Sequence, residues 1–276
     1  METVAVLLST YNGQEFLKSQ LESLRIQTAK NFHIYIRDDG SSDNTKNIIE
    51  NFKQNTSNCF LLSSDKNLGA AKSFMELLRN VEADYYMFCD QDDVWLKNKI
   101  DESFKAIKKL ENLNNCKPSL VFTDAQVVDA DLKVLSQSFI KTSGIKTKFV
   151  KQKGYAYVTN ISPGCTYIFN KNLRNIAIKD IENLPMHDWW LVLNAYKFGE
   201  LNFLNRADIL YRQHDNNVIG VHETNLKEMV KKIVNIKKTI TLQYKQYQFL
   251  EEKNFTNSII SYYFYKAKFI FKTFLS

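Results

Sequence analysis

The sequence predicts an α/β protein with a mainly parallel, doubly wound sheet and a helical extension at its carboxyl end. Two observations predict this fold class: short apolar runs alternate with amphipathic segments through the first half of the 276 residues, and polar loops follow the runs. Hydrophobic residues make up 44% of the chain and charged residues 24%, so a substantial core is expected and general disorder is excluded.

Four apolar runs in the first half are predicted to be buried strands. These runs are Val4–Leu8, Phe32–Arg37, Cys59–Leu62 and Tyr85–Cys89. Their apolar character is continuous rather than alternating, which is typical of strands covered on both faces. Between them, apolar side chains recur at helical spacing, as Leu17, Leu21 and Leu24 do. This order predicts parallel strands joined by right-handed crossovers.

The second half is less regular. Strand-like runs occur at Leu120–Phe122, Thr166–Phe169, Leu201–Phe203 and Ile209–Tyr211. A helix is predicted to begin near Met186, and a helical tail is indicated by spaced apolar residues from Leu226 onward: Met229, Val230, Ile233, Ile236, Ile240, Tyr244 and Tyr247. We therefore expect one domain over residues 1–225, with halves of about 1–125 and 126–225, and a basic amphipathic tail over 226–276.

The charge of the chain is unevenly distributed. Residues 226–276 contain ten Lys and three Glu, which equals the net charge of +7 for the whole chain. Residues 1–225 are therefore neutral, and no general field for polyanions is expected there. The tail contains no Arg and no known reader motif, so nucleic acid is not an expected partner.

No stretch of the sequence is apolar enough to span a bilayer. The apolar run at Val4–Leu8 has no basic region before it, so we expect no signal peptide. The four cysteines, at 59, 89, 116 and 165, lie in no metal-ligand spacing, which favours reduced thiols and a cytoplasmic location.

An acidic loop follows the fourth predicted strand. It contains Asp90, Gln91, Asp92 and Asp93. Neighbouring carboxylates repel one another, whereas hard ions such as Mg²⁺ or Mn²⁺ prefer oxygen ligands and commonly bind phosphate oxygens as well. The loop therefore predicts a site for a divalent metal and a nucleoside diphosphate. The alternative is a solvated turn with an Asp that caps a helix before Trp95.

Three other segments have both a structural and a functional interpretation. The loop Asp38–Asp43 is either an ordinary turn or a site for a base and ribose, and Asn67–Gly69 is either a helix start or a backbone approach to a nucleotide. Asp188 precedes two Trp residues near a predicted helix start, where a partly desolvated carboxylate could act as a general base. His187 is expected to be a packed histidine. His214 is either packed in the same way or a metal ligand.

Five motifs together resemble family 2 glycosyltransferases, whose GT-A fold is Rossmann-like. The motifs are Ser9–Gly13, Asp38–Asp43, Asn67–Gly69, Asp90–Trp95 and His187–Trp190, and the resemblance covers about residues 1–220. Within that family, His187–Trp190 followed by Tyr211–His214, Asn217 and Gly220 is similar to bacterial rhamnosyltransferases of cell-wall or capsular polysaccharide synthesis.

The resemblance implies a role for each motif. Thr10, Tyr11, Asn12, Asp39, Asn67, Asp90 and Gln91 would bind the nucleotide sugar; Asp92 and His214 would hold Mg²⁺ or Mn²⁺; Asp188 would be the catalytic base; and Asp93, Trp95, His187 and Trp189 would border the acceptor. The acidic motif is Asp-Gln-Asp-Asp, which leaves open whether Asp92 or Asp93 is the principal ligand. The Gln-x-x-Arg-Trp motif of processive synthases is absent, so a few sugars at most would be added per encounter.

The implied reaction is inverting transfer of a sugar to a hydroxyl of a saccharide or lipid-linked saccharide. The implied donor is dTDP-rhamnose, with a UDP-hexose or UDP-N-acetylhexosamine as the alternative. A sugar-nucleotide pyrophosphorylase would need a Gly-rich, Arg-containing loop after the first strand, where this chain has Thr10–Gln14. A basic-tailed binding protein without enzymatic activity is the other alternative.

The basic tail suits the surface of an anionic membrane, which would place the enzyme at the inner face of the cell membrane. Packing of the tail on the body or a homodimer is the alternative.

Overall fold

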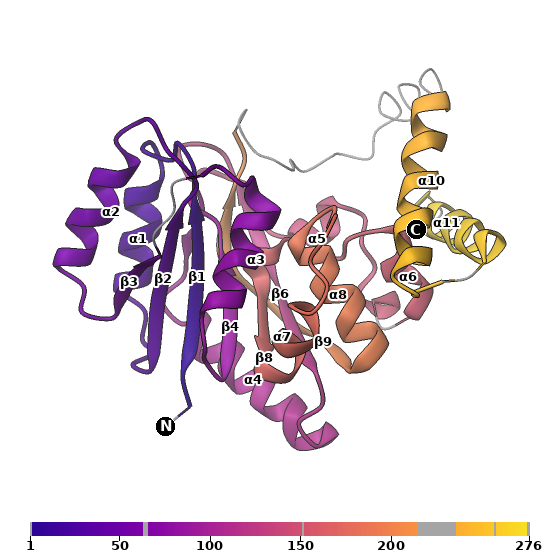
Figure 1. Ribbon diagram of the computed structural model, residues 1–276, viewed down its shortest axis with the longest axis horizontal. Helices are drawn as coiled ribbons and strands as arrows, with labels where there is room; N and C mark the ends of the chain where they lie inside the picture. Colours follow the sequence, from indigo (N-terminus) through magenta and orange to yellow (C-terminus); the bar gives the residue numbers. More distant parts are fainter. Residues whose placement is uncertain (1, 63–65, 151, 215–235, 257, 275–276) are drawn as a thin grey trace.

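The computed structural model describes residues 2–62, 66–150, 152–214, 236–256 and 258–274. They form one mixed sheet with helices on both faces and a helical pair beside it (Figure 1). The strands are β1 (Val4–Thr10), β2 (Phe32–Asp38), β3 (Cys59–Leu62), β4 (Tyr85–Cys89), β5 (Val94–Trp95), β6 (Ser119–Val128), β7 (Val134–Ser136), β8 (Tyr167–Asn170) and β9 (Glu200–Arg212).

The α-helices are α1 (Leu17–Arg25), α2 (Thr45–Gln54), α3 (Ala70–Asn80), α4 (Lys99–Asn114), α5 (Phe139–Thr142), α6 (Lys153–Val158), α7 (Lys171–Ala177), α8 (His187–Phe198), α10 (Ile236–Glu252) and α11 (Ile259–Phe274). Two short 3-10 helices, η1 (Thr147–Phe149) and η2 (Gly164–Thr166), lie in the second half.

The predicted parallel arrangement of the first half is confirmed, but the predicted burial is wrong for β3, the edge strand, where Phe60 and Leu61 are exposed. β1 pairs in parallel with β2 on one side and β4 on the other, and β2 pairs in parallel with β3. Leu8 of β1 is in register with Ile36 and Cys89, and all three side chains are fully buried. The carboxyl ends of β1, β2 and β4 therefore lie at one edge of the sheet, where the polar loops meet.

The second half departs from the predicted pattern in two ways. β8 lies between β4 and β6 and runs antiparallel to both, so the sheet is mixed. The runs Leu201–Phe203 and Ile209–Tyr211, expected as separate strands, belong to the single strand β9. The polar residues between them obscured this continuity, because Asn205 and Arg206 are exposed while Asp208 is buried.

β9 brings distant residues to the acidic loop. Its end pairs antiparallel with β5, with Val94 opposite Leu210 and Trp95 opposite Ile209. β5 directly follows Asp93, so this pairing places the segment from Arg212 to His214 beside the acidic loop, about 120 residues away in sequence.

Two helices of the basic tail pack against the second half of the body, beside α6 and α8 (Figure 1). The hydrophobic core includes Tyr247, Phe249 and Leu250 of α10, Phe255 of the connection and Tyr262 of α11. The predicted helical positions Leu226, Met229, Val230 and Ile233 lie outside the described residues. Among the described helices, none has the length and apolarity needed to cross a membrane.

Candidate active site

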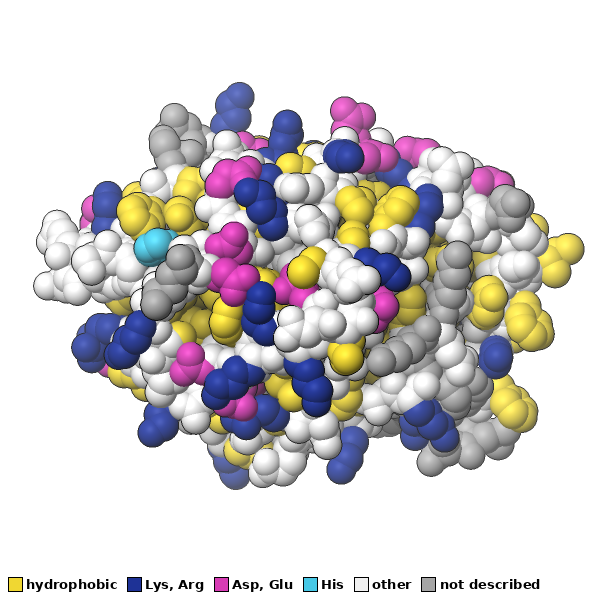
Figure 2. Space-filling view, turned by 90° about the horizontal axis from the view of Figure 1, so that it is seen from below, with side chains coloured by type: hydrophobic (Ala, Val, Ile, Leu, Met, Phe, Trp, Pro, Cys, Tyr) yellow, Lys and Arg dark blue, Asp and Glu magenta, His cyan; other side chains and the backbone are white. Residues whose placement is uncertain are grey.

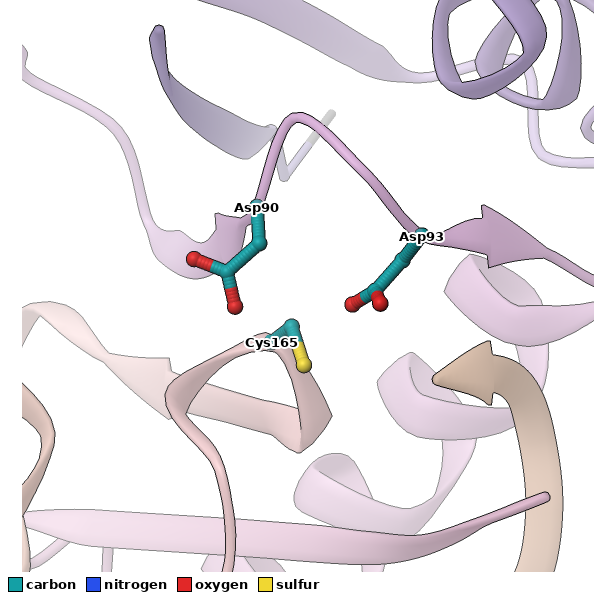
Figure 3. A group of neighbouring side chains, drawn as sticks. All are labelled: Asp90, Asp93 and Cys165. Atoms are coloured by element: carbon teal, nitrogen blue, oxygen red, sulfur yellow. The ribbon is translucent and has the colours of Figure 1, made fainter. Parts of the chain in front are cut away.

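The acidic loop forms the centre of the candidate site. Asp90 follows β4, Asp93 precedes β5, and Cys165 of η2 faces them, with their ligand atoms all within 4.8 Å of one another (Figure 3). Burial, together with the charges of Asp92 and Asp188, raises the pKa of Asp90 to about 7. The carboxylates at this edge thus repel one another, and a bound cation would relieve that repulsion.

Asp93 turns inward rather than toward solvent. Its side chain is fully buried, and the backbone N–H of Arg212 donates to its Oδ1 at 3.1 Å. Within the described residues no nitrogen or oxygen donor reaches its Oδ2, which has the Cys165 thiol beside it. Burial, followed by the charges of Asp92 and Asp90, raises the pKa of Asp93 well above its usual value.

Asp92 and His214 are brought together although they are 122 residues apart. Oδ2 of Asp92 lies 2.9 Å from Nε2 of His214, and both side chains remain partly exposed. Adjacent ligands of an octahedral ion with bonds of about 2.1 Å stand about 3 Å apart. In the structure the two side chains are hydrogen-bonded to each other, and the same separation would allow both to bind one divalent ion. Of the two candidates for principal ligand, Asp92 faces the open side and Asp93 the core.

Arg212 and Phe16 hold this pair in place. Nε of Arg212 donates to the backbone oxygen of Asp92 at 2.7 Å, and its guanidinium lies 4.5 Å from the centre of the Phe16 ring. The same ring packs against the imidazole of His214 with 4.8 Å between centroids. Arg212 thus acts mainly as a scaffold for the acidic loop, a role that the sequence did not indicate.

The loops after β1, β2 and β3 are joined through two aspartates. The Thr10 hydroxyl donates to Asp38 at 3.0 Å. The Asp39 carboxylate is paired with Arg37 and accepts the backbone N–H groups of Leu68 and Gly69, each at 2.8 Å. The buried Asp39 therefore ties the second loop to the third, next to the exposed Asn67.

Gln91 clamps the first loop. Its Oε1 accepts the backbone N–H of Tyr11 at 2.8 Å, and its Nε2 donates to the Tyr11 carbonyl at 3.0 Å. A Cβ added at Gly13 would lie only 2.3 Å from Oε1 of Gln91, which explains the glycine. The Gln91 amide is thus hydrogen-bonded to the first loop, and its expected role toward the nucleotide stays a prediction; the Tyr11 ring is half exposed.

Asn12 belongs to the same loop and has a positive φ of 45°. Its Oδ1 accepts the backbone N–H of Ser42 at 2.9 Å, and its own N–H donates to Ser41 Oγ at 2.8 Å. Asn is among the residues that tolerate this left-handed conformation best. The first and second loops are therefore linked at their tips.

Asp188 lies in the first turn of α8 and is almost fully buried. The side-chain NH₂ of Asn160 donates to its Oδ2 at 2.8 Å, and the backbone N–H of Trp189 donates to its Oδ1 at 2.6 Å. Burial raises the pKa of Asp188 to about 6, which these hydrogen bonds partly offset. A carboxylate with such a pKa is ionised at neutral pH and can accept a proton.

The charges of Asp188 and Asp90 interact, since the Asp188 carboxylate is among the causes that raise the pKa of Asp90. Asp188 comes from the second half of the chain and Asp90 from the first. The fold thus brings a buried candidate base near the candidate metal and nucleotide loop.

Four residues expected to border an acceptor are instead enclosed. His187 is stacked on Phe74 with 4.2 Å between centroids, and burial lowers its pKa to about 3, so it is neutral. The Trp189 indole donates to the carbonyl of Ala156 at 2.7 Å inside the core. Trp95 and Asp93 are 1% and 0% exposed, so no acceptor reaches any of these side chains in this conformation.

Several residues near the site were not predicted. Lys99 and Asp208 form a fully buried ion pair with 3.5 Å between Nζ and Oδ1, and the Lys99 ammonium lies 5.0 Å from the centre of the Trp95 ring. Asn160 was not predicted because it lies in no motif, and Cys165 was expected only as a reduced thiol, not beside Asp90 and Asp93. Their roles depend on tertiary contacts that no local pattern records.

The family model for "Glycosyl transferase family 2" matches residues 5–173. Among curated proteins, the dTDP-rhamnosyl transferase RfbG of Shigella flexneri is 32% identical over 232 residues, which cover 78% of this chain and 74% of RfbG. The Escherichia coli enzyme WfgD, described as a UDP-Glc:alpha-D-GlcNAc-diphosphoundecaprenol beta-1,3-glucosyltransferase, is 24% identical and covers 73% of each chain.

Solved structures share the fold at lower identity. TarS 1-349 of S. aureus in complex with UDP-GlcNAc has a TM-score of 0.57 and 18% identity, over 78% of this chain and 60% of TarS 1-349. The mannosyltransferase PcManGT of Pyrobaculum calidifontis, in complex with GDP-Man and Mn²⁺, has a TM-score of 0.57 and 14% identity. The match covers 77% of this chain and 56% of the PcManGT chain. The matched model and the relative at 32% identity together show that the chain is a glycosyltransferase of family 2 with a GT-A fold.

Proposed function

We propose that this enzyme transfers L-rhamnose from dTDP-rhamnose, with inversion, to a hydroxyl of a saccharide or lipid-linked saccharide in bacterial surface polysaccharide synthesis. The observation that carries this proposal is the meeting of the Asp92–His214 pair, Asp90 and the buried Asp188 at one edge of the sheet. The similarity to the dTDP-rhamnosyl transferase RfbG supports the choice of donor.

Asp92 and His214 would hold Mg²⁺ or Mn²⁺ in the proposed enzyme. Their 2.9 Å separation and partial exposure suit two ligands of one ion that also binds phosphate oxygens. When bound, the ion would stabilise the charge that develops on the leaving diphosphate. The Mn²⁺ bound to PcManGT, which has the same fold, supports this cofactor.

The residues of the chain itself would then perform three tasks. The loops at Thr10–Asn12, Asp39 and Asn67 would bind the nucleoside, with the half-exposed Tyr11 ring available to the base. Asp90 would contact the ribose or the metal. Asp188 would accept the proton of the acceptor hydroxyl as the oxygen attacks the anomeric carbon and the bond to the nucleoside diphosphate breaks.

The donor is tested by a screen. Purified enzyme would be incubated with Mg²⁺ or Mn²⁺, an acceptor extract and a panel of TDP-, UDP- and GDP-sugars, and the released nucleoside diphosphate would be measured. dTDP-rhamnose should give the highest turnover. A preference for a UDP-hexose or UDP-N-acetylhexosamine would replace the proposed sugar while leaving the reaction class intact. That alternative is favoured by the names of WfgD and of the TarS complex.

We further propose that α11 contacts an anionic membrane at its cytoplasmic face. One face of α11 packs on the body through Tyr262, whereas Ile260, Phe264 and Phe271 are 62–80% exposed at helical spacing. Figure 2 shows apolar and basic side chains side by side at the end of the molecule where the tail lies. Burial of such side chains in the headgroup region would bring the enzyme to a lipid-linked acceptor.

Charge favours a membrane over a homodimer as the occupant of this face. α11 contains three Lys and no Asp or Glu. A two-fold dimer through the same face would bring Lys268 and its neighbours close to their own copies, whereas anionic lipids would supply opposite charge. The division into a catalytic part of residues 1–225 and a tail of 226–276 is part of the same proposal, with the tail packed on the catalytic part as well as facing the membrane.

A further inference from the structure

Asn160 is the side chain that contacts the proposed base most directly. It precedes η2, and its Nδ2 donates to Oδ2 of Asp188 at 2.8 Å. The other oxygen of the Asp188 carboxylate is held by the backbone N–H of Trp189 at 2.6 Å. The two oxygens are therefore held by donors from different segments, which restricts rotation of the carboxylate.

The orientation of the Asn160 amide is determined by its neighbours. Its Oδ1 accepts the backbone N–H of Ile161 at 3.0 Å and lies 3.2 Å from the hydroxyl of Tyr167. A backbone N–H can only donate, so the amide oxygen must face Ile161. The NH₂ group must then face Asp188, where it can only donate.

Tyr167 anchors this arrangement in the sheet. Its ring is fully buried on β8, and its hydroxyl donates its one proton to the carbonyl of Ser162 at 2.6 Å and, at the longer distance of 3.2 Å, to Oδ1 of Asn160. The phenol thus connects the central strand to the segment that bears Asn160. A rigid strand is a better support for a reacting group than a loop alone.

The surroundings of Asp188 otherwise oppose its ionised form. The carboxylate is almost fully buried, and this burial raises its pKa. His187 on the same helix is neutral, and Tyr167 contributes no positive charge. Hydrogen-bond donors are the groups that can stabilise the ionised form under these conditions.

We propose that Asn160, held by Tyr167, is a positioning residue that fixes the Asp188 carboxylate and stabilises it in the ionised form that accepts the acceptor's proton. The inference rests on the proposed role of Asp188 as the base. It adds a specific requirement, which is an N–H donor at position 160 whose orientation is supported by Tyr167 of β8.

The test compares four variants. Asn160→Leu removes the donor at similar volume, Asn160→Asp replaces it with a second carboxylate, and Tyr167→Phe removes only the support. Thr159→Ala is the matched control, because the Thr159 hydroxyl donates to the Asn160 carbonyl at 3.1 Å without a hydrogen bond to Asp188. For each variant, kcat, donor KM, the pH profile of kcat/KM and the thermal midpoint would be measured with the best donor of the screen.

Hydrogen bonds to charged groups contribute enough for Asn160→Leu to lower kcat by about 10- to 100-fold and move the acidic limb of the profile upward by about 1 to 2 pH units. Asn160→Asp should have the larger effect, because two carboxylates would face each other. Tyr167→Phe should lower kcat by less than about tenfold. Donor KM and the Thr159→Ala variant should match wild type.

The inference is overturned if Asn160→Leu and Asn160→Asp both fold and retain wild-type kcat and pH profile while Asp188→Asn is inactive. That result would leave the base assignment intact. If Asp188→Asn is itself as active as wild type, the base assignment and the inference fail together. If one of the two Asn160 variants does not fold, the other one still tests the inference, because each removes the N–H donor in a different way.

Discussion

Replacement of Phe249 by Ala tests whether the tail is part of the catalytic body. The Phe249 ring is 8% exposed and lies in the core, with its centroid 5.6 Å from that of Trp189 and 6.0 Å from that of Trp190. Truncation of a buried Phe to Ala costs about 3–5 kcal/mol, and a chain of this size loses roughly 2–4 °C of Tm per kcal/mol. Phe249→Ala should therefore lower Tm by about 10 °C.

The matched control is Phe264→Ala, in which the same side chain is removed from the exposed face of the adjacent helix. Surface substitutions of this kind change stability by no more than about 0.5 kcal/mol, so Tm should stay near that of wild type. Thermal unfolding followed by circular dichroism gives both values. Equal shifts in the two variants, or a shift under about 2 °C for Phe249→Ala, would refute the packing of α10 on α8.

The same packing has a catalytic consequence. Trp189, which contacts Phe249, supplies the backbone N–H that holds Asp188. Phe249→Ala should therefore lower kcat as well as Tm. Removal of every residue after 226 should cause a loss of folding rather than of membrane contact alone, because five aromatic or aliphatic tail residues belong to the core.

Four further predictions concern the metal, the base and the membrane. Asp92→Asn should abolish Mn²⁺-dependent binding of TDP in calorimetry, and unchanged affinity would place the ion elsewhere. Asp188→Asn should keep donor binding but reduce transfer by several orders of magnitude, and a loss under tenfold would mean that another group is the base. The pKa of about 6 for Asp188 means that the base is protonated in acid, so wild-type kcat/KM should fall about tenfold per pH unit below about pH 6; a limb near pH 4 would contradict this. Ile260→Asp with Phe264→Asp should reduce sedimentation with anionic liposomes by at least tenfold at unchanged Tm, since each buried apolar side chain contributes about 1.5–3 kcal/mol; wild-type binding would exclude α11 as the contact.

The regular part of the fold could be predicted because its signals are local. Each of β1 to β4 is a continuous apolar run bounded by polar turns, and the helices between them have one apolar face. Apolar side chains in regular elements mostly face the core, so their spacing indicates the element before any tertiary contact is known. The direction of β8 and the length of β9 could not be predicted in this way, because they depend on pairing with strands that are distant in the sequence.

The sequence predicted the surroundings of some candidate site residues but not of others. Asp92 and His214 lie together as the resemblance implied, because β9 pairs with β5 and ends beside the acidic loop. Trp95, Trp189 and His187 were expected to border the acceptor, with packing as the alternative, and they are buried in the core or in the aromatic cluster around Phe74. An aromatic residue beside a polar motif serves packing and recognition equally well, and the sequence does not separate the two.

The sequence by itself determined that acidic and polar residues stand at the ends of buried strands, that the chain resembles a known family of transferases, and that its excess positive charge lies in the tail. Only the tertiary structure decided which carboxylates face the open edge and which are buried, and that the Asn160 amide donates a hydrogen bond to Asp188. The physical reason is that composition and periodicity are local, whereas burial, hydrogen-bond partners and the resulting pKa shifts arise from residues that are far apart in the chain.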